Sequence, residues 1–277
     1  MGGLSQKNLE IIKNNFHFIE VDEISEGAVT EIGKRLGLEF NPDEISVKSD
    51  WKKFKKYFVF DKDEKRLLFI KDIWETNGFK EVIALHMAKH IFEPELVAED
   101  YVFGFHYGRA FSKKPQPFLA TTFVPGEPLK KRGWEPHAFE LGRQFYLHQV
   151  LSLYDCELRH FLIHNDKVRR IDLGLGFYHL TNRYRGFEEY MPKGLPYMRK
   201  FWRGYDFEEG KIKVMILNTR DELKRLLDEL YELVEDDLID FRPKRFVRRL
   251  ERYWDVERLP ILDFPSHNKE PNEDPDV

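Results

Sequence analysis

Two aspartates flank a pair of short apolar runs in YDCELRHFLIHNDKVRRIDLGLGF, residues 154–177. Asp155 lies shortly before HFLI, and Asp172 ends VRRID. The two runs and the HND between them predict a β-hairpin, and carboxylates beside apolar strands are costly unless they are paired or metal-bound. Because hairpin strands are antiparallel, both carboxylates would emerge at the same end. This geometry suits a metal–phosphate site with a nearby base.

The segments ahead of this hairpin would have to position it, and most of them are strand-like. Residues 44–73 contain three β-type runs, EISVKSDW, KKYFVFDKD and KRLLFIKDI, with DKDEK predicting a turn between the last two. GFKEVIALHMAKHIF predicts a helix from about Phe79 to Ile91. LVAEDYVFGFHYG and PFLATTFV are further strand candidates, and PGEP at 125–128 breaks the pattern. Helical spacing also occurs in 5–15 and 27–36.

After residue 125 the character becomes helical. EPHAFELGRQFYLHQVLSLY, residues 135–154, predicts a helix directly before the hairpin. Residues 219–236 predict a second helix with Thr219 as its N-cap, and 241–254 a basic amphipathic one. PSHNKEPNEDPDV in the tail predicts disorder.

Composition bounds the class of protein. The 277 residues fit one large domain or two small lobes, and 42% hydrophobic residues allow a sizeable core. A net charge of −4 makes no case for a nucleic-acid partner from overall charge. The single cysteine, Cys156, excludes an internal disulfide and suits a reducing cytosol. The sequence contains no run of about 18 apolar residues, so it predicts no membrane-spanning helix. Its charged residues, 34% of the total, are typical of thermophile proteins.

Five segments occur in an order that resembles the protein-kinase-like superfamily, over roughly residues 45–240. LLFIKDI supplies Lys71 on a strand, and FKEVIALHMAKHI supplies Glu81 on the next helix. FLATTFVPGEPL is similar to the hinge between two lobes, and a long helix follows it. Asp155 is then followed five residues later by His160, and the hairpin leads to Ile171-Asp172-Leu173-Gly174. The atypical and archaeal branch, including archaeal enzymes that phosphorylate tRNA, is the part of the superfamily that this plan resembles.

The resemblance implies a function for each of these residues. ATP would lie near the hinge at Phe123 and Val124. Lys71, held by Glu81, would position the phosphates, with Glu75 as the alternative partner. The implied roles of the remaining residues are Mg²⁺ or Mn²⁺ binding for Asp172 and His160, and orientation or deprotonation of an acceptor hydroxyl for Asp155.

Each of these residues also has a purely structural interpretation. Asp172 and Asp155 could cap turns, Lys71 and Glu81 could be solvated surface charges, and His160 could be a structural histidine.

Three departures from the superfamily pattern leave a pseudokinase or an RNA-binding scaffold as the alternative. Leu153 stands where many kinases have His, and His160 replaces the usual metal-binding Asn. No glycine-rich loop precedes Lys71. KSDWKKFKKY, residues 48–57, occupies its place, and lysines there can contact phosphate only as point charges.

Cations and aromatic rings alternate in several stretches, a mixture that binds phosphate backbones and stacks on bases. The other interpretation is a solvated face beside core aromatics. The candidate RNA contacts are Trp51, Lys52, Lys53, Lys55, Lys56, Arg245, Arg248 and Arg249. An RNA hydroxyl, with tRNA foremost, is therefore the leading acceptor, a protein serine or threonine the next, and a small alcohol a third.

These observations predict an α+β chain with a two-lobed kinase-like fold in the cytoplasm. We expect an extension over 1–43, a β-rich N-lobe over 44–126, a helical C-lobe over 127–259 and a disordered tail over 260–277. The oligomeric state is left open.

Overall fold

The structure is a computed structural model of the 277-residue chain. It describes residues 6–50, 55–73, 81–82, 84–86, 88–89, 96–97, 100–107, 116–130, 134–151, 153, 157–173, 194–212 and 214.

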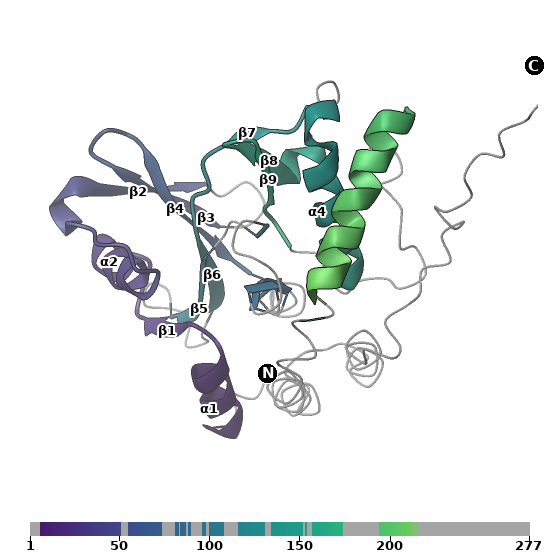
Figure 1. Cartoon of the computed structure of the whole chain (residues 1–277). Helices are drawn as coiled ribbons and strands as arrows, with labels where there is room; N and C mark the ends of the chain where they lie inside the picture. Colours follow the sequence, from purple (N-terminus) through teal and green to yellow (C-terminus); the bar gives the residue numbers. More distant parts are fainter. Residues whose placement is uncertain are drawn as a thin grey trace, which may run out of the picture.

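A six-stranded sheet forms the first half of the molecule (Figure 1). Its order is β1-β5-β6-β4-β3-β2; β1 runs parallel to β5, and the other neighbours are antiparallel. The strands are β1 (Phe18–Val21), β2 (Ile45–Asp50), β3 (Lys56–Asp61), β4 (Arg66–Asp72), β5 (Tyr101–His106) and β6 (Gln116–Thr122).

The two faces of this sheet differ because side chains alternate along a strand. Leu68 and Ile70 of β4 are fully buried, and they belong to the same core as Val29 and Ile32 of α2 (Glu26–Arg35). Ser25 caps α2 by accepting a hydrogen bond from the Ala28 amide at 3.4 Å. The side chain of Lys71 therefore lies on the opposite face of β4. A second helix, α1 (Gln6–Asn15), precedes β1.

The second half combines a small three-stranded sheet, of order β7-β8-β9, with helices (Figure 1). The predicted hairpin is present as β8 and β9, and its turn residues Asn165 and Asp166 have φ of 50° and 59°. Such a turn matches the twist of antiparallel strands, and Asn and Asp tolerate it. The elements are β7 (Glu127–Pro128), η2 (Glu135–His137), α4 (Ala138–Val150), η3 (Leu158–His160), β8 (Phe161–His164), β9 (Lys167–Arg170) and a helix over 195–212.

Two helices of this half cross at glycines. A Cβ added to Gly142 of α4 would collide with the Phe201 carbonyl, and one added to Gly204 would collide with the Phe139 carbonyl. Phe201 and Phe145 pack beside this crossing with ring centroids 5.6 Å apart. The absence of side chains at both glycines thus lets the two helix backbones approach closely.

The arrangement confirms the α+β class, with a strand-rich first half and helices after it, as expected of a two-lobed kinase-like fold. The β-type runs of 44–73 form β2, β3 and β4, and the helix predicted for 135–154 is η2 and α4. The helix over 195–212 was not predicted, since its segment RKFWR, residues 199–203, indicated a cation–aromatic patch rather than a helix. The helices predicted at 219–236 and 241–254 and the tail lie outside the described residues.

The residues ahead of 44 take part in the large sheet. Phe18 and Ile19 of β1 pair with Phe103 and Gly104 of β5, and Ile19 lies in the core beneath α2. The segment assigned to an extension therefore supplies a strand, β1, and two helices, α1 and α2, to this half. Within the described ranges, no helix is long and apolar enough to cross a membrane.

Candidate active site

The structure brings Lys71 and Glu81 together. Lys71 lies near the end of β4, on the face opposite α2, and its Nζ donates to Glu81 Oε1 at 2.7 Å. The Lys71 side chain is 19% exposed, whereas Glu81 is buried. A buried carboxylate thus fixes the position of a cation that is still partly exposed to solvent.

Burial dominates the electrostatics of Glu81. Desolvation raises the pKa of its carboxyl, the Lys71 ammonium opposes that rise, and the Asp172 carboxylate adds to it. Without Lys71 the ionised form would lose the interaction that favours it. The two residues are therefore coupled: the charge of each favours the charge of the other.

Asp172 is a second carboxylate close to Lys71. Its Oδ1 is 3.9 Å from Lys71 Nζ, and its side chain is 46% exposed. The residue has a left-handed φ of 58°, two positions after β9 ends. Left-handed backbone in a non-glycine residue is uncommon, though Asp adopts it more readily than most, and such residues cluster at functional sites. Here it places a carboxylate beside the cation of a different sheet.

His160 connects this carboxylate to the hairpin. It is buried at the end of η3, and its Nε2 lies 3.8 Å from Asp172 Oδ2. Its carbonyl accepts from the Ile171 amide at 2.8 Å, which joins the residue before Asp172 to the start of β8. Glu81, Lys71, Asp172 and His160 therefore form one continuous row.

The predicted hinge residues lie at the other end of β4 from Lys71. The Phe123 amide donates to the Leu67 carbonyl at 2.9 Å, and β6 pairs Leu119 with Lys71. Phe123 is 40% exposed, whereas Val124 is buried. Phe123 thus offers a ring at the rim of the sheet, and Val124 is part of the core.

The predicted base and most of the predicted RNA contacts cannot be placed. Asp155, Trp51, Lys52, Lys53, Arg245, Arg248 and Arg249 lie outside the described residues. Leu153 and Glu157, two positions before and after Asp155, are described: the Leu153 amide donates to the His148 carbonyl at 3.0 Å, and the Glu157 carbonyl accepts from the His160 amide at 2.9 Å. Glu75, the alternative partner of Lys71, also lies outside the described residues.

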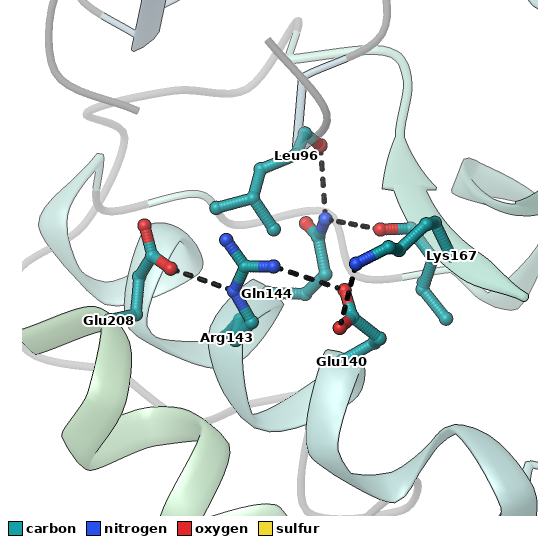
Figure 2. Close-up of polar contacts among 7 residues, drawn as sticks. Leu96, Glu140, Arg143, Gln144, Lys167 and Glu208 are labelled. Atoms are coloured by element: carbon teal, nitrogen blue, oxygen red, sulfur yellow. Dashed lines mark hydrogen bonds and ion pairs between the residues drawn. The ribbon is translucent and has the colours of Figure 1, made fainter. Parts of the chain in front are cut away.

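A buried polar cluster on α4 holds the hairpin in place, and sequence reasoning missed it (Figure 2). Gln144 Nε2 donates to the Leu96 carbonyl at 3.0 Å and to the Val168 carbonyl at 2.8 Å. The Arg170 amide also donates to the Leu96 carbonyl, at 2.9 Å. One backbone oxygen thus joins α4 to β9, the strand that ends just before Asp172.

The same cluster joins α4 to the helix over 195–212. Arg143 Nε donates to Glu208 Oε2 at 2.8 Å, and both side chains are nearly inaccessible. Arg143 also pairs with Glu140, and Glu140 with Lys167 of β9 (Figure 2). Charged residues at helical spacing in a sequence usually predict a solvent-exposed helix face. The role of these residues becomes visible only in the structure, where they are buried against a helix that is far away in the sequence.

The donor set fits a metal ion that is bound together with phosphates. Among the described residues no three His, Cys, Asp or Glu side chains converge on one point. Magnesium is commonly bound by one or two carboxylates plus substrate phosphates, so the exposed Asp172 carboxylate suits it. The imidazole of His160 suits manganese better than magnesium.

No protein-family model matches the sequence, and no curated protein matches it either. Among solved structures the chain is similar to macrolide 2'-phosphotransferase from Brachybacterium faecium, with 12% identity and a TM-score of 0.38. That similarity covers 81% of this chain and 97% of the other. At this identity and TM-score it supports no functional inference, and the roles proposed below rest on the residues of the site.

Proposed function

We propose that this protein transfers a phosphoryl group from ATP to an acceptor hydroxyl. The observation that carries the proposal is Lys71, whose Nζ lies 2.7 Å from the buried carboxylate of Glu81 and 3.9 Å from the exposed carboxylate of Asp172, which follows β9 of the other sheet. An oriented cation beside a carboxylate that can bind metal is what a nucleoside triphosphate requires of a protein. The same residues hold these roles in the kinase-like plan that the sequence resembles.

The proposed roles are those that the resemblance to the kinase-like plan implies, and the charge of each group suits its role. Lys71 binds phosphate oxygens, and Glu81 fixes the direction of its ammonium. Asp172, with His160 beside it, would hold Mg²⁺ or Mn²⁺, which neutralises phosphate charge when bound. Asp155 orients or deprotonates the acceptor hydroxyl. Catalysis on this scheme is mostly positioning and charge neutralisation.

RNA, and tRNA in particular, is the acceptor we propose first. The support is the alternation of cations and rings in the sequence, because such mixtures bind phosphate backbones and stack on bases. Of the candidate contacts, Lys55 and Lys56 are placed, with Nζ atoms 4.9 Å and 5.9 Å from the ring centres of Tyr57 and Phe69. A protein hydroxyl is the second acceptor, and a small alcohol is the third.

Labelling with γ-labelled ATP tests the activity and the acceptor together. The protein is incubated with Mg²⁺ or Mn²⁺ and with total RNA, total protein or small alcohols in separate reactions. We expect label in RNA from the wild type and none from Lys71→Ala. Label in protein alone would correct the acceptor and leave phosphoryl transfer in place. Label in no pool, with intact ATP binding, would favour the second candidate.

That second candidate is a nucleotide-binding pseudokinase or RNA-binding scaffold without catalysis. His160 stands where the related enzymes have a metal-binding Asn, and no glycine-rich loop precedes Lys71. The substitution His160→Asn separates the two. A catalytic site should retain or improve its magnesium-supported turnover, because an amide oxygen suits that ion better than an imidazole. A scaffold would show no turnover in either form.

A further inference from the structure

A second lysine lies directly opposite Lys71. In the β3–β4 register Lys56 pairs with Lys71, so both side chains leave the same face of the sheet. Lys56 Nζ lies 5.9 Å from the centre of the Phe69 ring, on the strand that carries Lys71. Like charges directly opposite each other destabilise a sheet. An anion that both cations bind would offset this repulsion.

The hairpin that carries Lys56 has no glycine with which to bind phosphate through its backbone. No glycine occurs from residue 38 to residue 77, which includes β2, β3 and β4. Without glycine, a close approach of the backbone to phosphate is hindered. Side-chain cations are therefore the groups of these strands best suited to bind phosphate, and the register places Lys56 beside Lys71.

Two phenylalanines form the next pair on the same face. Phe58 lies opposite Phe69, with ring centroids 5.3 Å apart, and both rings are partly exposed. A step of two residues along a strand is about 7 Å, so the ring pair lies about that far from the lysine pair. In a nucleotide, one sugar separates the base from the α-phosphate, which is a comparable span. Bases stack on aromatic rings without strong preference for the base.

We propose that this face holds a nucleoside triphosphate through side chains, with Lys56 as a second phosphate contact and the Phe58–Phe69 pair as the wall for the base. The inference rests on the proposed function, since it concerns the same ligand. It adds two properties: the hairpin binds phosphate by charge rather than through its backbone, and the base is held by stacking. Weak discrimination among ATP, GTP, CTP and UTP is the consequence, because every base has a stacking face.

Calorimetric titration with ATP and with inorganic tripolyphosphate, both with magnesium, tests the two parts separately. Lys56→Gln should weaken both ligands about tenfold, the loss of one charged hydrogen bond. Phe69→Leu should weaken ATP and leave tripolyphosphate unchanged. The matched controls are Lys62→Gln, an exposed lysine of the same hairpin that pairs with Glu44, and Phe60→Leu, further along β3. Both controls should bind as the wild type does.

Conservative variants guard against a loss caused by misfolding. Lys56→Arg should recover tripolyphosphate binding, and Phe69→Tyr should recover ATP binding. Unchanged ATP affinity in Lys56→Gln and Phe69→Leu, with a loss in Lys71→Ala, would overturn this inference and leave the proposed function intact. Absence of ATP binding to the wild type would rule out both this inference and the proposed function. If the two variants weaken single-stranded oligoadenylate but not ATP, the face binds RNA and the nucleotide assignment is wrong.

Discussion

Lys71 lies between two carboxylates in different surroundings. Glu81 is buried and shares a short hydrogen bond with it, whereas Asp172 is 46% exposed and 3.9 Å away. The buried partner costs stability, because desolvation disfavours its ionised form. The exposed partner keeps its negative charge accessible to a metal ion. On the proposed function, Glu81 orients the cation and Asp172 holds the metal beside it.

The substitution Glu81→Gln tests the orienting role. The raised pKa means that folded Glu81 binds its proton at higher pH than the unfolded chain does, so its contribution to stability falls as the pH rises through that range. The variant lacks this titration, so its free energy of unfolding should fall less between acid and neutral pH. Turnover should fall by about 10²-fold because Lys71 is misplaced. Denaturant unfolding across pH and a turnover assay measure the two effects.

The substitution Asp172→Asn tests the metal-binding role. Asn tolerates the left-handed backbone at this position, so the fold should be preserved while the charge is lost. Metal-dependent ATP binding should disappear, and turnover should fall by at least about 10²-fold. Asp166→Asn is the matched control, because it has the same left-handed φ in the β8–β9 turn. Unchanged calorimetric affinity for metal–ATP in Asp172→Asn would remove this residue from the site.

At the scale of elements, α4 determines where the hairpin lies. Gln144 bonds to the backbone of β9 and of Leu96, and Arg143 bonds to Glu208 of the helix over 195–212. The crossing of these two helices depends on Gly142 and Gly204, each packed against a carbonyl of the other helix. The position of Asp172 after β9 thus depends on the contacts of α4 with β9 and with the helix over 195–212.

The substitution Gly142→Ala tests this crossing. The added methyl group would meet the Phe201 carbonyl, so the helices must separate, and we expect a loss of about 1–3 kcal/mol in the free energy of unfolding. Gly210→Ala is the control in the second helix, where nothing lies within 4 Å of the added group. It should be neutral or stabilising by up to about 1 kcal/mol. Equal effects in urea denaturation would show that the close approach is not what matters.

At the scale of the whole molecule, the helical half contains a histidine that the fold keeps uncharged. His148 of α4 is buried, and burial together with the Arg170 guanidinium holds the pKa of its imidazole well below its usual range. The Phe145 ring stacks beside the His148 ring, with the two ring centroids 6.4 Å apart. The unfolded chain can protonate this ring in mild acid, and the folded chain cannot. Unfolding is therefore coupled to proton uptake.

Acid should weaken the fold through His148. The ordinary pKa of histidine is about 6.5. As the pH falls below this value, the unfolded state binds a proton at His148 and the native state does not. Stability present above that pH is lost by up to about 1.4 kcal/mol per pH unit. His148→Gln should flatten this part of the profile, measured by urea denaturation between pH 5 and pH 8. A profile as steep as that of the wild type would exclude His148 as the cause.

Local patterns in the sequence predicted several helices and strands, including the strand that carries Lys71 and the one that precedes Asp172. Alternation of apolar residues marked β3, β4 and the β8–β9 hairpin, and helical spacing marked α4. The pairing of Lys71 with Glu81, with Glu75 as the alternative, and of Asp172 with His160 was implied by the resemblance to the kinase-like plan, and the structure places Lys71 beside Glu81 and His160 beside Asp172. Periodicity is a local property, so it survives in the sequence without knowledge of the fold.

The tertiary structure alone decided how the parts meet. Nothing in FIEV predicts that β1 joins the large sheet beside β5, and nothing in AFELGRQ predicts that Arg143 is buried against Glu208. No sequence pattern predicts the left-handed backbone of Asp172 or the pairing of Lys56 with Lys71 either. Each depends on residues far apart in the chain or on a strand register. These are set by how whole faces pack, because the free energy of burial depends on the partner surface as well as on the residue itself.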